Sequence, residues 1–275
     1  MSLFLKHPGK VEWTSDQIRA VSSIARKYGS GKIFTTTREG IYLPEVDLQD
    51  EKTAFQVREI LASNGLEAGL VKDKGCTSRS ALNYNVCIGR PVCPKGLING
   101  KKLTEDIKAV LGKYEKTDSL PGDLRIAISG CPNRCVRAQV NDIGIHGAVK
   151  VISDADYCIG CGNCVSTCYS VAMKIGASGA AERDTKRCDD CGYCAKVCPA
   201  GGNMLGAFYY ALSLGGRLGR NPRPPVFTAE IFSQTDLRDF LELLVGDYCR
   251  EANKGERLAD WLERLGKEEA IRRYI

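Results

Sequence analysis

The first part of the chain switches repeatedly between helical and strand-like spacing of its apolar residues. A capping-box signature opens residues 14–28, whose apolar positions recur at helical spacing, and residues 50–63 repeat that spacing. Between these segments, β-branched residues at 32–37 and apolar residues at 41–43 predict two short strands around a turn, and another strand is expected near 66–71. Elements in this order predict a ferredoxin-like sandwich, so the fold class is α+β.

Two further elements are predicted later in the chain. Residues 124–128 form a strand-like apolar run that leads into a glycine turn, and we expect a helix to start just after Gly130. Residues 235–250 carry leucine and phenylalanine at the spacing of an amphipathic helix. With 275 residues and 43% hydrophobic composition, the chain is long enough for one sizeable core and a small additional domain.

Eight of the 14 cysteines form two copies of one pattern, CxxCxxCxxxC. They are Cys158, Cys161, Cys164 and Cys168, followed by Cys188, Cys191, Cys194 and Cys198. This spacing is typical of a pair of [4Fe–4S] clusters, in which the fourth cysteine of each run binds the other cluster. Structural zinc is the alternative, but zinc sites take four ligands each and give no reason for a third step in both copies. We therefore expect the chain to transfer electrons.

The cellular compartment matters because a disulfide framework would require an oxidising environment. Residues 1–10 contain too short an apolar run for a signal peptide, and no stretch reaches the length of a membrane span. We predict a cytoplasmic protein without a membrane span. The formal charge of +6 leaves out anionic clusters, and no block of like charge or basic aromatic stripe favours a nucleic-acid partner.

A second set of four cysteines precedes the doubled CxxCxxCxxxC pattern. Cys87 and Cys93 are separated by five residues, and Cys131 and Cys135 by three. The predicted helix start would aim backbone N–H groups at whatever these cysteines bind, which favours an anionic cluster. Taken alone, this spacing also describes zinc ligands or buried thiols. The remaining Cys76 and Cys249 fit no cluster, and we expect them to be ordinary thiols.

Several short segments spread over the chain match the motifs of one known family. They are Thr35–Arg38, the Cx5C run Cys87–Cys93, the GCPNxC run Gly130–Cys135, Asn141–Gly147, the glycine-rich Leu214–Arg220, and Gly255–Arg257 with Trp261 and Gly266. Together they resemble the siroheme-containing sulfite and nitrite reductases, and in particular the siroheme subunit of anaerobic, dissimilatory-type sulfite reductases. The resemblance covers nearly the whole chain.

The resemblance implies one reductase repeat with an insertion. Residues 1–75 would form its ferredoxin-like N-terminal domain, and residues 76–149 and 202–275 its siroheme and [4Fe–4S] domain. Residues 150–201 would be an inserted ferredoxin domain with two [4Fe–4S] clusters. Both ends of such an insertion should lie close together on the surface of the parent domain.

The resemblance also implies the cofactors, which would be siroheme and three [4Fe–4S] clusters. Cys87, Cys93, Cys131 and Cys135 would hold the siroheme-coupled cluster, and Cys135 would bridge to the siroheme iron. Electrons would pass to this center from the two ferredoxin-type clusters.

The family's anion-binding cations match this chain only in part. The cations expected to act on substrate are Arg38, Arg125 and Arg79, and the residues expected to bind the cofactor are Thr37, Arg38, Arg125, Cys135, Arg217 and Arg220. Asp123 stands where the family has a lysine, and residues 82–85 lack the usual arginine, so that Arg79 lies further back. The basic residues at 217–223 could equally form a solvated loop.

The implied activity is the six-electron reduction of sulfite to sulfide, with nitrite reduction to ammonia as the close alternative. A second class of function also stays open, a non-catalytic electron-transfer or siroheme-binding protein on the same scaffold. Because the chain contains only His7 and His146, we expect cations with bound water to donate protons rather than imidazole. A single repeat predicts a homodimer or hetero-oligomer, and the reaction needs an electron-donor protein or subunit.

Overall fold

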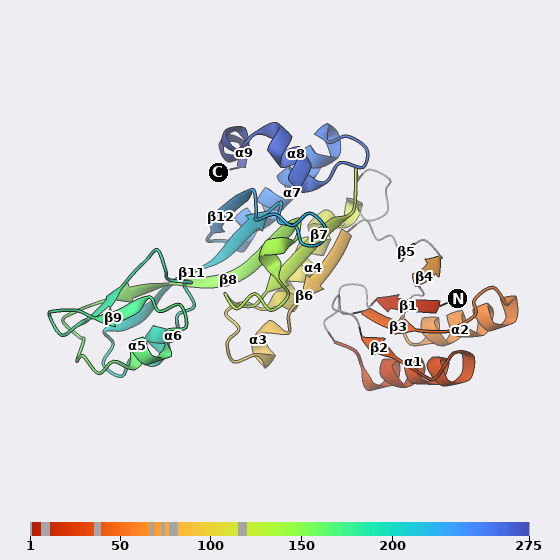
Figure 1. The fold of residues 1–275 in the computed structure, drawn as a ribbon, viewed down its shortest axis with the longest axis horizontal. Coiled ribbons are helices and arrows are strands. Elements are labelled where there is room, and N and C mark those ends of the chain that lie inside the picture. The colour runs from red at the N-terminus through yellow and green to blue at the C-terminus, as the bar shows by residue number, and fades with distance from the viewer. Residues whose placement is uncertain are drawn as a thin grey trace.

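Two five-stranded sheets organise the chain in the computed structural model (Figure 1), in which β1 to β5 form one sheet and β6, β7, β8, β11 and β12 the other. The structure describes residues 2–6, 12–35, 40–66, 69–72, 75–76, 82–114 and 120–274. A two-stranded sheet of β9 and β10 lies at the far end of β8 and β11, opposite the N-terminal unit in this view.

The N-terminal unit is built on an antiparallel sheet with the strand order β2-β3-β1-β4-β5. Its elements are β1 (Ser2–Lys6), α1 (Ser15–Tyr28), β2 (Phe34–Thr35), β3 (Gly40–Leu43), α2 (Glu51–Ser63), β4 (Gly69–Lys72) and β5 (Gly75–Cys76). The order of the first four strands is that of a ferredoxin-like sandwich. The sequence patterns missed β1, although it is the middle strand, because five residues are too few to show a clear period.

Side-chain caps start both helices of this unit. Thr14 accepts a hydrogen bond from the Gln17 amide at 3.2 Å, and the Gln17 side chain accepts one from the Thr14 amide, so the predicted capping box is confirmed. Asp50 caps α2 by accepting from the Thr53 amide. Leu3 and Leu5 of β1 are buried against both helices in one hydrophobic cluster.

The second sheet has the order β12-β11-β8-β7-β6 and is mixed. Its strands are β6 (Leu82–Val86), β7 (Leu124–Ser129), β8 (Ile143–Ser153), β11 (Asn203–Leu214) and β12 (Phe227–Ile231). β6, β7 and β8 run parallel, whereas β11 pairs antiparallel with β8 and β12. Parallel neighbours bring the carboxyl ends of β6 and β7 to the same edge of the sheet.

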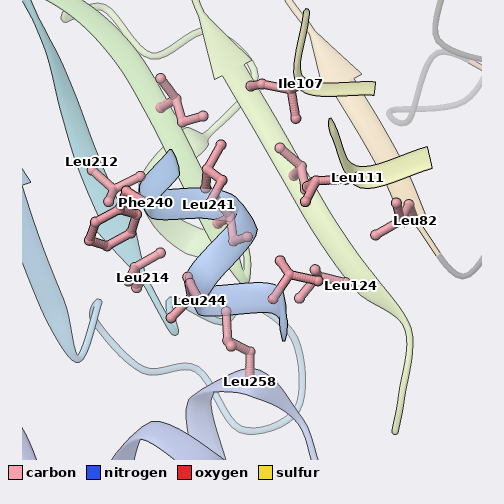
Figure 2. Close-up of a cluster of buried hydrophobic side chains, with 14 of the residues drawn as sticks. Leu82, Ile107, Leu111, Leu124, Leu212, Leu214, Phe240, Leu241, Leu244 and Leu258 are labelled. Atoms are coloured by element: carbon pink, nitrogen blue, oxygen red, sulfur yellow. The ribbon is translucent and has the colours of Figure 1, made fainter. Parts of the chain in front are cut away.

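One face of this sheet holds the main core. Leucine and isoleucine side chains of β6, β7, β8 and β11 pack against α4 (Gly100–Leu111) and α7 (Gln234–Glu251), as Figure 2 shows. Since side chains alternate along a strand, the intervening residues lie on the other face. We call this the polar face, and it carries Asn83, Asn85, Arg125, Ser129, His146 and Ser213.

A buried ion pair joins the C-terminal helices to this sheet. Arg257 precedes α8 (Leu258–Leu265), which is followed by α9 (Lys267–Tyr274). The Arg257 guanidinium donates to both carboxylate oxygens of Asp142 at 2.7 and 2.8 Å. The Asp142 side chain is only 1% exposed. Asp142 also accepts from the Arg125 amide of β7.

A lobe rich in cysteine projects from the end of β8 and β11. Ser153 of β8 pairs with Asn203 of β11, and residues 154–202, here called the cysteine lobe, lie between them. The lobe contains α5 (Asn163–Thr167), β9 (Met173–Ile175), β10 (Ala181–Arg183) and α6 (Tyr193–Lys196). Its two chain ends therefore lie side by side, and the long β8–β11 ribbon carries it away from the main core (Figure 1).

The helix expected just after Gly130 was a wrong prediction. Residues 130–137 form turns, followed by the 3₁₀ segment η2 (Ala138–Val140). Arg134 and Arg137 have φ angles of 48° and 55°, in the left-handed region, which an α-helix cannot include. Short helical segments also occur at α3 (Gly89–Val92) and η1 (Gly112–Tyr114). None of the helices within the described ranges has the length and apolar character to cross a membrane.

Replacing Asp142 with alanine should destabilise the fold strongly. The change leaves the Arg257 guanidinium and the Arg125 amide without their shared acceptor, which should lower the free energy of unfolding by about 3 kcal/mol. Urea unfolding would measure the loss. The control, Asp239→Ala on the exposed side of α7, should stay within about 0.5 kcal/mol of the parent. Equal stability of the two variants would contradict this role of Asp142.

Glu256 should make stability depend on pH. The Arg264 guanidinium and the Asn253 amide donate to its carboxylate and lower the pKa of Glu256 to about 2. A lowered pKa in the folded state gives a contribution that is complete above the usual value of 4.5 and is lost as the pH falls toward 2. Glu256→Gln should be less stable than the parent at pH 7, and urea midpoints should show this difference shrinking below pH 4.5.

Candidate functional site

The loops carrying Cys87 and Cys131 meet at the edge where β6 and β7 end. Three glycines allow the close approach of these loops: a Cβ on Gly130 would lie 2.9 Å from the Gly89 Cα, and one on Gly96 would lie 2.7 Å from the Arg90 amide nitrogen. The Gly130 carbonyl accepts from the Leu97 amide at 2.7 Å. Glycine is therefore required for the Cx5C and GCPNxC loops to pack against each other.

Four thiols gather where these loops meet. The Gly130 amide donates to the Cys87 Sγ at 2.9 Å. Burial raises the pKa of Cys131, and the nearby Cys135, Cys87 and Cys93 raise it further. Cys131 is buried and Cys135 is exposed. A raised thiol pKa disfavours four thiolates on their own, but a cationic metal center would stabilise them.

Backbone amides in turns take the place of the expected helix start. A backbone hydrogen bond from Asn133 partly opposes the burial that raises the pKa of Cys131. The Gly130 amide donates to Cys87 in the same way. Amide groups that point at sulfur in this way stabilise an anionic center without a helix dipole.

Several buried polar atoms near this edge have no hydrogen-bond partner among the described residues. They are Asn85 Oδ1, Ser129 Oγ and Gln139 Oε1. Asn85 and Ser129 lie two residues before Cys87 and Cys131, and Ser129 is paired in register with His146. Since buried polar groups are normally satisfied, these atoms fit a polar cofactor or bound water at this end of the polar face.

His146 is neutral at physiological pH. Burial, with the Arg134 guanidinium as the next cause, lowers the pKa of His146 to about 4. The imidazole therefore lacks the extra proton of a cationic acid. The expectation that cations and water, rather than imidazole, donate protons stays a prediction.

The structure places only some of the predicted cations. Arg125 lies on the polar face, opposite Asn83 in the register of β6 and β7. Thr37, Arg38 and Arg79 lie outside the described residues. Within the described ranges, the side chains of Arg217 and Arg220 have no ion pair or hydrogen bond, whereas Arg223 already binds Asp260 and Glu263.

The glycine-rich stretch lies against the segment that follows Cys135. A Cβ on Gly216 would lie 2.0 Å from the Gln139 carbonyl oxygen of η2, and one on Gly144 of β8 would lie 2.0 Å from the Ala138 oxygen. The Leu214–Arg220 motif is thereby brought next to the GCPNxC motif, about eighty residues earlier.

In the cysteine lobe, the first run lies near the end of the second. Burial raises the pKa of Cys164, and the nearby Cys158 and Cys161 raise it further. A Cβ on Gly202, four residues after Cys198, would lie 2.9 Å from the Cys158 Cα. Cys198 therefore lies near the start of the first run.

The thiols of the second run also influence one another. Burial, with Cys188 and Cys191 as further causes, raises the pKa of Cys194 to about 11. The Lys95 ammonium lies 5.1 Å from the center of the Tyr169 ring and 5.9 Å from that of Tyr193, so it contacts the residues that follow Cys168 and precede Cys194.

The described cysteines are not spaced as ligands of single ions. Over the described ranges, no three His, Cys, Asp or Glu side chains converge closely enough to hold one metal ion. A four-iron cluster takes one thiolate at each iron, so its ligands need not meet at a point.

Side-chain contacts among the described residues join the cysteine lobe to the site. Besides the two Lys95 contacts, Arg134 of the GCPNxC loop forms an ion pair with Asp189 at 3.8 Å. The Val149 amide of β8 donates to the Asp190 carbonyl at 2.8 Å. Neither Lys95 nor Arg134 was predicted as a functional residue, because single cations beside cysteine runs carry no spacing signal.

Comparison with known families accounts for these motifs. Residues 78–274 match the model of the nitrite and sulphite reductase 4Fe-4S domain, and residues 3–57 match the nitrite/sulfite reductase ferredoxin-like half domain. The chain belongs to the nitrite and sulphite reductase family. The family resemblance found in the sequence is thus confirmed.

Individual members of the family are about 30% identical to this chain over little more than half of its length. The chain is 32% identical over 160 residues to the coenzyme F420-dependent sulfite reductase of Methanocaldococcus jannaschii, covering 58% of this chain and 24% of that protein. It is 30% identical over 155 residues to one subunit of the anaerobic sulfite reductase of Salmonella typhimurium, covering 54% of this chain and 44% of that subunit. The chain thus matches less than half the length of these relatives.

Two matches extend over most of the chain. The beta subunit of dissimilatory-type sulfite reductase from Archaeoglobus fulgidus is 24% identical over 271 residues, covering 91% of this chain and 72% of that protein. The crystal structure of dissimilatory sulfite reductase I superimposes with a TM-score of 0.70, covering 98% of this chain and 68% of that one at 17% identity. The likeness to this structure establishes the shared fold.

Replacing Cys131 should remove one cluster. If the four thiols at the edge of β6 and β7 hold a [4Fe–4S] cluster, Cys131→Ser should lower the iron content by about four atoms per chain. The matched control is Cys249→Ser, since Cys249 lies on α7 and packs against the main core. Iron analysis of anaerobically purified protein measures both variants. Equal iron contents would contradict the assignment.

Proposed function

We propose that the chain is a siroheme-dependent reductase that reduces sulfite to sulfide. The observation that carries the proposal is the meeting of four thiols at the end of a polar sheet face, within a chain of the nitrite and sulphite reductase family. The names of the relatives favour sulfite, since all three relatives described above are sulfite reductases or subunits of them.

The residues present fit the proposed cofactors. Cys87, Cys93, Cys131 and Cys135 would hold a [4Fe–4S] cluster, and the exposed Cys135 would be the sulfur shared with siroheme. Arg217 and Arg220 would bind siroheme carboxylates. When bound, the siroheme and its cluster supply the redox chemistry, which includes storing and delivering electrons.

The chain's own contribution is to bind a small anion and to supply protons. Arg125 offers a permanent cation on the half-buried part of the polar face, and its amide is held by the buried Asp142 carboxylate. A guanidinium in such surroundings binds an oxyanion more strongly than one in open water, because the local dielectric is lower. Protons would reach the anion through water bound to such cations, because His146 is neutral.

The cysteine lobe would supply the electrons. We propose that it is an inserted ferredoxin domain, with one cluster on Cys158, Cys161, Cys164 and Cys198 and the other on Cys188, Cys191, Cys194 and Cys168. Pairing of Ser153 with Asn203 supports an insertion, and the Lys95 and Arg134 contacts support close placement of the second cluster beside the site.

Nitrite is the alternative substrate, and a non-catalytic role is the alternative class. Asn83 and Asn85 occupy the part of β6 where the family resemblance implies an arginine, so the polar face has fewer cations than expected. Weaker anion binding would favour an electron-transfer or siroheme-binding protein. The relatives named as subunits support assembly with a second copy or with an electron-donor subunit.

Turnover measurements distinguish these proposals. The purified full chain, loaded with cofactors and kept anaerobic, should oxidise reduced methyl viologen when sulfite is added, and nitrite should be tested in parallel. Sulfide should appear at one per six electrons consumed. Siroheme absorption without turnover of either sulfite or nitrite would contradict the proposed reductase activity and support the non-catalytic alternative.

Arg125 should contribute to anion binding. Arg125→Gln should lower kcat/KM for the anion by roughly 10- to 100-fold, the equivalent of one charge-assisted hydrogen bond. The control Arg238→Gln removes the same charge from the exposed side of α7 and should leave kcat/KM unchanged. An unchanged kcat/KM in both variants would show that Arg125 does not face the substrate.

A further inference from the structure

A partly buried charge network lies beside the start of the second cysteine run of the lobe. At its center is Asp190, between Cys188 and Cys191, with a side chain that is 14% exposed. Its carboxylate accepts from the Tyr209 hydroxyl of β11 at 2.7 Å and from the Lys150 ammonium of β8 at 2.9 Å. Lys150 also pairs with Glu230 of β12 at 2.7 Å. The network therefore ties this run to three strands of the main sheet.

Arg183 at the end of β10 is the member of the network that reaches the sulfur. Its Nη1 lies 3.7 Å from the Cys188 Sγ and 3.4 Å from the Asp190 Oδ1, and its Nη2 donates to the Val151 carbonyl at 2.8 Å. The Arg183 side chain is 17% exposed, so water screens its charge only partly. The Asp190 carboxylate and the Val151 carbonyl together fix the position of the guanidinium.

The Arg183 contact matters because Asp190 also lies against the same sulfur. The Cys188 Sγ is 3.5 Å from the Asp190 Oδ1, a contact in which a thiol would donate its proton. A cysteine that binds iron has lost that proton, which leaves a thiolate beside a carboxylate. The guanidinium touches both groups and offsets the repulsion between them.

The sulfurs of Cys158, Cys161, Cys164 and Cys198, which would hold the other cluster, have different surroundings. Backbone amides contact two of them: Ala181 donates to Cys158 at 3.2 Å, and Asn203 donates to Cys198 at 3.4 Å. Amides also contact Cys188 and Cys168, but among the described residues the Arg183 guanidinium contacts only the Cys188 sulfur. Neutral amides stabilise a reduced cluster less than a partly buried cation does. The two runs would therefore give their clusters different reduction potentials, even though their spacing is identical.

We infer that Arg183, held by Asp190, raises the reduction potential of the cluster on Cys188, Cys191, Cys194 and Cys168. This inference rests on the proposed function, which places two clusters in the lobe. Uptake of one electron from a low-potential donor such as reduced viologen takes such a center from about −2 to about −3 in net charge and breaks no bond. A cation at the ligand sulfur stabilises the added charge. Arg183 thus favours the reduced form of this cluster, whereas the negative charge of Asp190 disfavours it.

Redox titration followed by electron paramagnetic resonance tests the inference on the full, cluster-loaded chain. Arg183→Gln should shift one lobe cluster to lower potential by the equivalent of about a tenfold change in its oxidised-to-reduced ratio, which is 59 mV for one electron. Asp190→Asn should shift the same cluster in the opposite direction. Arg183→Lys, which keeps the charge without the planar fork, should shift it less than Arg183→Gln.

The matched control is Lys174→Gln. Lys174 lies on β9 of the same lobe, where it pairs with Glu182 and is 74% exposed. This variant therefore removes one positive charge that is screened by water. Iron and sulfide analysis confirms that each variant keeps its clusters. Potentials of Arg183→Gln and Arg183→Lys that match those of Lys174→Gln would overturn the inference alone. A parent chain without any [4Fe–4S] signal would overturn both this inference and the proposed function.

Discussion

The close approach of the Gly89 and Gly130 backbones is the constraint on which the site depends. A Cβ at Gly130 would lie 2.9 Å from the Gly89 Cα, so any larger residue would force the two cysteine loops apart. Cys87 and Cys131 follow parallel neighbouring strands, which brings them to one edge of the sheet, but only the glycines let their loops touch. The four thiols share one location as a result.

The other parts of the fold support this edge from two sides. On one side, the main core packs α4 and α7 against β6, β7 and β8, and the buried Asp142 and Arg257 pair joins the C-terminal helices to the same strands. On the other side, the β8–β11 ribbon carries the cysteine lobe, which contacts the site through Lys95 and Arg134. Electron delivery and substrate binding would thus be attached to a single sheet.

The sequence predicted helices correctly where the cap and the apolar spacing both lie within one helix. The capping box at Thr14 and Gln17 and the apolar spacing of α1, α2 and α7 correspond to the observed helices. β1 was missed because five residues give little periodicity, although its pairing with β3 and β4 holds the N-terminal sheet together. The helix expected after Gly130 was wrong because Arg134 and Arg137 adopt left-handed backbone conformations.

The sequence by itself determined the chemistry available to this protein: twelve cysteines in cluster-like spacings, glycines beside them, and few histidines. Ligand type and spacing are local properties, so they can be read along the chain. The tertiary structure decided which groups meet. Only folding brings Arg183 to the Cys188 sulfur, Lys95 to two tyrosines of the lobe, and Gly216 to the segment after Cys135. Such contacts join residues on separate strands and loops, and their distances depend on packing that no local pattern encodes.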